Sequence, residues 1–331
     1  MKILYVGQLS EGGTCLDRMR ALQRLGNEVI GLDVSTFQSS HRLLRSAQWH
    51  WHPRFLLGGL NRHIIAAARG AGRLDCVWVD KGIWIFPETI DALKAGFAAT
   101  TVHFTPDPQL LFHRSRHFVA SIPLYDWLVT TKSFEVALYR TAGAANVVES
   151  QQSFCPVRYS APQPLARFSS EVGFVGHFEK SYAKHMSAIP DVSHVWGNGW
   201  TAAALKGQIA RGAVQGAGLW GPDYVNALAS FKIGLGLLSK YIPEQHTTRS
   251  FEIPAAGTFL LAERTDEHQA FFEEGEEAEF FDSPDELASK ANFYLSHEAP
   301  RQRIARRGRE RCHRSGYDTD SVLARVLNEI V

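Results

Sequence analysis

The stretch EQHTTRSFEIPAAGTFLLA places two acids, two hydroxyls and one guanidinium around the expected start of one short helix. These side chains are Glu244, Thr247, Thr248, Arg249 and Glu252. Either threonine has the side chain to cap the helix, and Pro254 must sit early in it or kink it, while Gly257 is placed to end it before the strand TFLLA. An exposed helix start with free backbone N–H groups, two hydroxyls and a cation is suited to bind a diphosphate.

The two glutamates would repel an anion unless they bind something else. Carboxylates accept hydrogen bonds from vicinal diols, and a nucleotide sugar carries hydroxyl pairs at both ends of its diphosphate. The order acid, cation, acid along the chain therefore fits sugar, phosphate and ribose. A plainer alternative stays open, in which Glu244 is a solvated acid and Arg249 pairs with Glu252 on the helix surface, a contact worth ~0.2–0.5 kcal/mol.

The longer stretch SKYIPEQHTTRSFEIPAAGTFLLAERTDEHQAFFEEGEEAEFFDSPDEL resembles the carboxyl-terminal domain of the spore-maturation-type (CgeB-like) glycosyltransferases, which are related to the family-4 retaining glycosyltransferases of GT-B fold. Glu244 and Glu252 have the spacing of the larger family's Glu-x7-Glu motif, and IPAAGTF matches its small-residue, glycine, strand pattern. The resemblance, specific over residues 171–295, implies that Glu252 binds ribose hydroxyls and that Glu244 faces the donor sugar.

Glycines and basic residues after two expected strands are further candidates for binding the donor. VGFVGHFEKSYAKH resembles the family's first strand and turn of the second domain, which implies that the backbone at Gly176 approaches phosphate and that Lys180 reaches it. His177 ends the same strand and would bond phosphate or only the local backbone. Gly12 and Gly13 do not form a G-x-G-x-x-G fingerprint, and we expect their backbone to face the donor phosphates or the acceptor.

His103 and Asp107, in VHFTPDP, follow another expected strand, where a parallel sheet presents reactive groups. Either residue could act as the base that deprotonates an acceptor hydroxyl. The alternative is that Asp107 only opens a turn before Pro108 while His103 packs in the sheet. If the reaction retains configuration, as in the family-4 relatives, the leaving phosphate can accept the proton and no dedicated base is needed.

Composition limits the partners of the chain. Its 331 residues carry a formal net charge of +1, so no global field recruits nucleic acid. The four cysteines are scattered, His50 and His52 do not have the spacing of a metal site, and no D-x-D follows a first-domain strand, so we expect no metal and no cofactor beyond the nucleotide-diphosphate sugar as co-substrate. No apolar run spans a bilayer and no signal peptide opens the chain, which favours a cytoplasmic protein.

The elements needed to position these residues alternate as strand and helix. Apolar runs predict strands at 3–6, 27–33, 75–80, 100–104, 126–131 and 145–150, and a second series at 171–177, 193–200, 231–239 and 258–263. Such alternation predicts an α/β protein with two facing Rossmann-like domains and parallel sheets, the GT-B arrangement, with a C-terminal helix crossing back. The expected boundaries are 1–155 for the acceptor-side domain, 156–165 for a proline-bearing linker, 166–310 for the nucleotide-sugar domain and 311–331 for the returning helix.

Two surface tracts remain. HRLLRSAQWHWHPRFLLGGLNRH mixes Arg, His and Trp with apolar residues, which fits a half-buried segment but leaves peripheral contact with a membrane open. The arginines of RQRIARRGRERCHR are expected to form a solvated helix face that offsets the acidic run EEGEEAE.

The sequence therefore predicts a metal-independent enzyme of glycan biosynthesis, a hexosyltransferase that moves a sugar from a nucleotide-diphosphate donor to a hydroxyl of a glycan, protein or small molecule. A nucleotide-sugar 2-epimerase of the same fold, or a catalytically silent nucleotide- or glycan-binding protein, are the alternatives.

Overall fold

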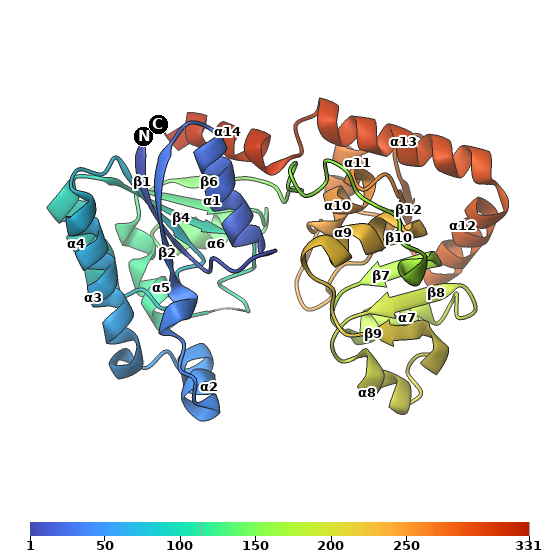
Figure 1. Cartoon of the computed structure of the whole chain (residues 1–331), viewed down its shortest axis with the longest axis horizontal. Coiled ribbons are helices and arrows are strands. Elements are labelled where there is room, and N and C mark those ends of the chain that lie inside the picture. The colour runs from blue at the N-terminus through green and yellow to red at the C-terminus, as the bar shows by residue number, and fades with distance from the viewer. Residues whose placement is uncertain (113, 331) are drawn as a thin grey trace. The chain divides into compact units, whose positions relative to one another are not determined.

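The computed structural model describes residues 1–112 and 114–330, and shows two units that are each built on a six-stranded parallel sheet (Figure 1). The first unit comprises Met1–Gln151 and the chain from Thr319 onward, and the second comprises Gln152–Asp318. The expected α/β class with two Rossmann-like domains is confirmed. No helix in the described part of the chain is both long enough and apolar enough to cross a bilayer.

The first unit has the strand order β2-β1-β3-β4-β5-β6. Its elements are β1 (Lys2–Gly7), α1 (Thr14–Arg24), β2 (Glu28–Asp33), η1 (Val34–Phe37), α2 (Arg42–His50), α3 (Arg54–Ala71), β3 (Cys76–Asp80), α4 (Pro87–Phe97), β4 (Thr100–Thr105), α5 (Arg116–Ser121), η2 (Ile122–Leu124), β5 (Trp127–Thr130), α6 (Glu135–Thr141), β6 (Val147–Glu149) and α14 (Thr319–Ile330). The chain leaves β1 for β2 on one side and reaches β3 on the other, which makes β1/β3 the switch point of this sheet.

The second unit has the strand order β12-β11-β10-β7-β8-β9. Its elements are η3 (Ala166–Phe168), β7 (Ser170–Val175), α7 (Lys180–Met186), β8 (Ser193–Trp196), α8 (Trp200–Leu205), η4 (Arg211–Ala213), β9 (Val214–Gly216), α9 (Gly221–Ala229), β10 (Phe231–Gly236), α10 (Arg249–Ala255), β11 (Phe259–Glu263), α11 (Asp266–Phe271), β12 (Glu279–Phe281), α12 (Pro284–Ser296) and α13 (Glu298–Arg314). Counted within the unit, this is the 3-2-1-4-5-6 order of dinucleotide-binding domains, with β7/β10 at the switch point.

Strand β1 shows why helices cover both faces of the first sheet. Ile3 and Tyr5 pack in one core with residues of α1 and α14, whereas Leu4 and Val6 pack in another with residues of α3 and α4. Successive side chains of a strand point to opposite faces, so a strand that is apolar throughout must be covered twice. A continuous apolar run is therefore the sequence pattern that this layer order requires.

Helix α14 completes the first unit although it follows the whole second unit in sequence. It packs against α1, and Leu323 and Val326 are buried beside the side chains of β1. Arg24 of α1 donates to Asp320 with an Nε–Oδ2 distance of 2.7 Å. The predicted return of a C-terminal helix to the first domain is thus confirmed.

The chain passes between the units at 151/152 and again at 318/319, rather than within the expected linker at 156–165 or at 310/311. Phe154 and Tyr159 are fully buried in the second core, and the amide of Phe154 donates to the carbonyl of Tyr317 at 3.3 Å. The proline-bearing stretch therefore packs on the second unit, because its two aromatic side chains have a core to enter.

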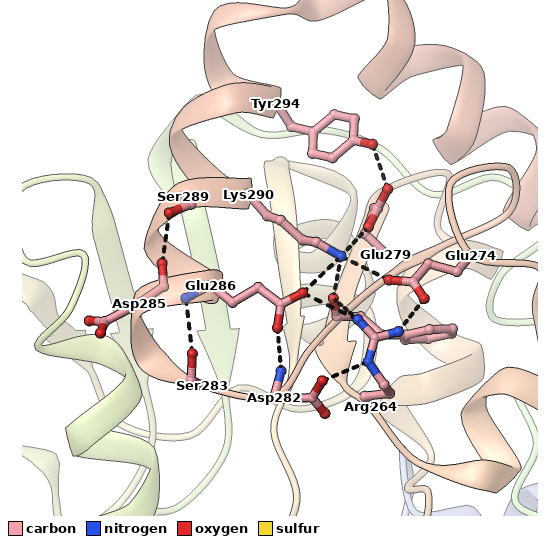
Figure 2. A network of polar contacts seen from close by, with 11 residues as sticks. Arg264, Glu274, Glu279, Asp282, Ser283, Asp285, Glu286, Ser289, Lys290 and Tyr294 are labelled. Carbon is pink, nitrogen blue, oxygen red and sulfur yellow. Dashed lines mark hydrogen bonds and ion pairs between the residues drawn. The ribbon is translucent and has the colours of Figure 1, made fainter.

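The acidic run 273–279 leads into β12, an edge strand of the second sheet, and takes part in a network of ion pairs. Figure 2 shows Arg264 and Lys290 surrounded by Glu274, Glu279 and neighbouring acids. Lys290 Nζ lies 2.8 Å from Glu274 and 2.7 Å from Glu279, and Arg264 bonds Glu274 as well. Burial would raise the pKa of Glu274, but the two cations hold that pKa below its usual range.

The arginines of α13 also pair with this run, as expected from the sequence. Arg314 Nη2 lies 3.0 Å from Glu277, and Arg307 pairs with Glu276. Arg264 and Lys290 add partners that the sequence did not indicate, since they come from the end of β11 and from α12.

Candidate functional site

The switch point of the second sheet gathers most of the residues that the sequence singled out. Gly176 follows β7, Glu244 follows β10, and Arg249 begins α10, which leads on to β11. Ligands of open α/β sheets bind outside the carboxyl ends of the strands at such a point. The topology alone therefore brings together segments that lie about seventy residues apart in the chain.

Arg249 lies across the ends of β7 and β10. Its Nη2 donates to the carbonyl of Leu237 at 3.3 Å, and its guanidinium carbon is 5.1 Å from the ring centre of Phe174. A methyl group on Gly176 would lie 3.6 Å from Arg249 Nη1 and only 2.8 Å from the Phe174 ring. Gly176 therefore leaves the space beside the guanidinium open.

Two polar atoms of the segment that opens α10 are buried without a hydrogen-bond partner among the described residues. They are Arg249 Nε and Thr247 Oγ1. Leaving a buried donor unpaired costs about 1–3 kcal/mol, so native structures rarely do it without a reason. A guanidinium and a hydroxyl left unpaired together at a switch point indicate an anion as the missing partner.

The start of α10 differs from the expected capped and exposed helix end. Thr248 occupies the cap position with helical dihedral angles and makes no side-chain cap, and α10 has seven residues. The amide of Thr247 donates to Ser250 Oγ at 3.1 Å, and the amides of Ser250 and Phe251 donate to the carbonyls of Thr247 and Thr248. The expectation of free amides was wrong for these three groups, so Arg249 and the Thr247 hydroxyl are what this segment offers an anion.

A buried histidine fixes the turn before α10. His268 Nδ1 donates to the carbonyl of Glu263 at 2.6 Å, which leaves Nε2 to accept from Ser250 Oγ at 2.7 Å. Ser250 Oγ in turn accepts from the amide of Thr247. Burial lowers the pKa of His268 to about 4, so this neutral tautomer persists at physiological pH. These hydrogen bonds connect Glu263, the last residue of β11, through His268 and Ser250 to Thr247, whose hydroxyl has no partner among the described residues.

This histidine should make the second unit sensitive to acid. The folded pKa of about 4 lies below the ordinary value of 6.5, so the unfolded chain binds the extra proton first and the free energy of unfolding falls as the pH drops through that window. We expect His268 to contribute a loss of about 2 kcal/mol between pH 7.5 and pH 5. Urea unfolding at both pH values, compared with His268→Gln, measures this contribution. The exposed His297→Gln is the control, and parallel losses in all three proteins would contradict the assignment.

Glu252 is almost fully enclosed, with an exposed fraction of 3%. Tyr224 of α9 donates to its Oε2 at 2.7 Å. Burial raises the pKa of Glu252, while the hydrogen bond from Tyr224 and the charges of Arg158 and Arg249 oppose the rise. The guanidinium of Arg249 bonds Leu237 rather than Glu252, so the helix-surface ion pair that the sequence left open does not form.

Glu244 belongs to a second cluster at the same strand ends. Its Oε2 accepts from the amide of Ser239 at 3.0 Å, and Ser239 Oγ donates to Glu179 Oε2 at 3.1 Å. Glu179 is buried, and the exposed ring of His177 lies 3.4 Å from its other oxygen. Sequence reasoning missed Glu179, because an acid just before the exposed Lys180 of α7 is also typical of an ordinary helix start.

In the first unit, the predicted glycines form the loop before α1. Gly12 has a φ of 76°, and Gly13 stands at the cap position of α1. A buried cluster in the same unit was not indicated by any pattern in the sequence. Arg18 Nε donates to Asp80 Oδ2 at 2.7 Å, and Tyr5 donates to the same oxygen at 2.6 Å.

His103 and Asp107 lie near one another but in different surroundings. The His103 ring is fully buried against Phe118, its Nε2 is 3.2 Å from the carbonyl of Lys81, and burial lowers its pKa to about 4. Asp107 is about one third exposed, and its Oδ2 lies 2.5 Å from Lys81 Nζ. Lys81 has a φ of 70°, an uncommon value for a residue with a side chain. The geometry favours the packing interpretation for His103 and leaves Asp107 accessible.

Part of the chain matches a known protein family, and several solved structures share the fold of the whole chain. Residues 181–328 match a family model described as glycosyl transferase-like. HepE of Anabaena, solved with UDP-glucose, is 13% identical with a TM-score of 0.67, and sucrose-phosphate synthase of Thermosynechococcus elongatus is 12% identical with a TM-score of 0.70. An alpha-glucosyltransferase solved with UDP and a 13-mer DNA is 14% identical with a TM-score of 0.72. Each alignment covers 100% of this chain and 99% of the other.

The chain has the GT-B fold. The stretch that matches the glycosyl transferase-like model begins in α7 and includes Glu244, Arg249 and Glu252. A search of the curated proteins found no match. Within the described residues of this GT-B protein, no three His, Cys, Asp or Glu side chains are grouped to hold a metal ion.

Proposed function

We propose that the chain is a glycosyltransferase that takes a sugar from a nucleoside-diphosphate donor bound at the β7/β10 switch point of the second unit. The observation that carries this proposal is the pair of unpartnered polar atoms, Arg249 Nε and Thr247 Oγ1, in the segment whose arginine borders the open space at Gly176. An anion there would satisfy both. The glycosyl transferase-like match and the nucleotide complexes of proteins with the same fold support a diphosphate as that anion.

The neighbouring groups have roles that fit this donor. Arg249 and the Thr247 hydroxyl hold the diphosphate, with His177 and Lys180 at its outer side. Glu252 holds the ribose hydroxyls and exchanges its bond from Tyr224 for bonds from the ligand. Glu244 faces the sugar, on the Glu179 side of the site. Charge on the departing nucleotide is then stabilised by fixed donors without a metal ion.

We place the acceptor on the first unit, where Asp107 and Lys81 stand at the carboxyl ends of β4 and β3. A carboxylate within reach of water is suited to accept the proton of an acceptor hydroxyl in a direct displacement. In a retaining reaction the leaving phosphate takes that proton, and Asp107 only orients the hydroxyl. We propose the retaining course and kinship with the spore-maturation-type enzymes, and His103 as a positioning residue that holds the Lys81 carbonyl.

A thermal-shift panel of nucleotide sugars tests the donor site. A donor present at a hundred times its Kd should add about 2.7 kcal/mol to the free energy of unfolding, a readily measured rise in Tm. Glu252→Gln should abolish that rise, whereas Glu310→Gln, a change at an exposed acid of α13, should leave it intact. If no nucleotide sugar shifts the Tm, the donor site is refuted.

Product analysis separates the enzyme classes. A glycosyltransferase should release nucleoside diphosphate at a rate that depends on an added acceptor. Turnover of the intact nucleotide sugar to an isomer without acceptor would instead show the 2-epimerase, and binding without any turnover would show a silent binding protein.

A further inference from the structure

A pocket of about 810 Å³ lies on the first unit, and none of the groups assigned above lines it. Three connections form it, and they follow β2, β3 and β4 at the carboxyl end of the sheet. The lining residues that matter here are Arg42, Arg45, Trp49, Ile83, Phe112 and Arg114. Figure 1 shows α2 at the end of this unit opposite to α14 and the start of β1. The carboxyl end of a parallel sheet is where ligands of such folds bind.

Helix α2 exposes both charged and apolar side chains. Arg42, Arg45 and Trp49, which recur at helical spacing, line the pocket, while the intervening Leu43 is 72% exposed. A surface helix ordinarily turns its apolar stripe inward and its charges to water. In α2 the apolar Leu43 is exposed beside Arg42 and Arg45, which are themselves exposed and border the pocket.

The pocket is strongly cationic. Arg42, Arg45 and Arg114 line it, none of them forms an ion pair with a described residue, and no acid is among the lining residues. Arginine forks match phosphate oxygens bidentately, and an apolar wall such as Phe112 excludes competing water. The chemistry of this pocket is therefore that of a phosphate-binding site.

The surface next to the pocket is unusually apolar. Trp51 is 76% exposed and Phe55 is 82% exposed, and both lie on the same segment as Leu43. Such residues beside arginines are typical of helices that lie in the interface of an anionic bilayer. A soluble phosphate ester or a nucleic acid would use the arginines but would leave these side chains in water.

We propose that the pocket binds the phosphate group of a lipid, which seats the α2–α3 corner on an anionic membrane surface. Leu43, Trp51 and Phe55 then enter the headgroup region around the bound phosphate. The near-zero net charge of the chain makes this attraction local, so it depends on a few named arginines. The proposal requires no catalysis and stands independently of the proposed function.

Vesicle sedimentation of the full chain tests this site. Binding to phosphatidylglycerol vesicles should exceed binding to phosphatidylcholine vesicles at least tenfold. Each arginine near an anionic surface strengthens binding about fivefold, so Arg42→Ala/Arg45→Ala should weaken it about twenty-five-fold. The matched control Arg69→Ala/Arg140→Ala, at two exposed arginines of α3 and α6, should stay within threefold of the unchanged protein.

A second pair of variants tests the apolar part. Leu43→Ser/Phe55→Ser should weaken vesicle binding at least fivefold, whereas Leu205→Ser/Phe293→Ser, at exposed positions of the second unit, should not. Circular dichroism and Tm confirm that each variant folds. Equal binding to both vesicle types, or equal loss in the matched arginine control, would overturn the proposal. So would binding of glycerol 3-phosphate or duplex DNA that is lost with Arg42 and Arg45 while vesicles do not bind.

Discussion

Replacing Arg249 by methionine should lower kcat/KM about a thousandfold and leave the free energy of unfolding within about 1 kcal/mol. The rate should fall because one fixed donor aimed at developing anionic charge is worth about 10²–10³, and Arg249 brings a full charge as well. Stability should hold because Arg249 Nε has no partner among the described residues, so its removal breaks one hydrogen bond, to Leu237, and the contact with Phe174. The buried Glu252 loses the nearby charge of Arg249 but keeps the charge of Arg158 and the hydrogen bond from Tyr224.

The measurement is steady-state turnover of the donor identified by the thermal-shift panel. Arg211→Met, at an exposed arginine of the same unit, should keep full activity. Arg249→Lys should recover part of the rate, since a lysine keeps the charge but loses the planar fork. If the methionine variant retains kcat/KM within threefold while binding the donor normally, Arg249 does not contact the diphosphate.

Replacing Gly197 by alanine should destabilise the second unit by about 3–4 kcal/mol. A methyl group on Gly197 would lie 1.8 Å from the carbonyl oxygen of Gly176, far inside van der Waals contact, and that oxygen also accepts from Trp200 Nε1 at 2.8 Å. The φ of 157° is also one that residues with a side chain rarely adopt, so the dihedral angle adds to the obstacle that the carbonyl presents. The carbonyl belongs to the backbone, which cannot rotate aside as a side chain could. The ends of β7 and β8 must therefore move apart.

Urea unfolding gives the loss, and Gly207→Ala is its matched control. Gly207 has a φ of 70° but no atom within 4 Å of the added methyl, so only the dihedral cost of about 1 kcal/mol applies. Because the same shift would move Gly176, Gly197→Ala should also weaken the donor's thermal shift. Equal destabilisation by the two variants would mean that the Gly176 carbonyl moves away from the added methyl group at no cost in free energy.

Much of the fold could be predicted because buried parallel strands are continuous apolar runs. All six strands of the first sheet and four strands of the second follow that pattern. The two that escaped, β9 and β12, have three residues each, as does β6, which the run ANVVES had indicated. The boundary between the units lies at 151/152 rather than within the predicted linker. Prolines suggest a linker, whereas the burial of Phe154 and Tyr159 depends on a core that cannot be recognised from the local sequence.

The candidate site was less predictable than the fold. Glu252 and Arg249 stand out through spacing, but Ser250 and His268 meet only after α10 and α11 have packed, so their bonds leave no local pattern. The same holds for Glu179 with Ser239, and for Arg18 with Asp80, which are 62 residues apart. His103 shows the opposite failure, because a histidine near a strand end looks reactive until its burial is known.

The placement of α14 has a consequence for biosynthesis. The side chains of Leu323 and Val326 close a core whose other walls come from the opening segment of the protein. The ribosome must therefore translate the entire second unit before the core of the first unit can be completed. Until then, one apolar face of the first sheet stays uncovered. Nascent chains ordinarily mature from their leading end, whereas this architecture makes the earlier unit finish last.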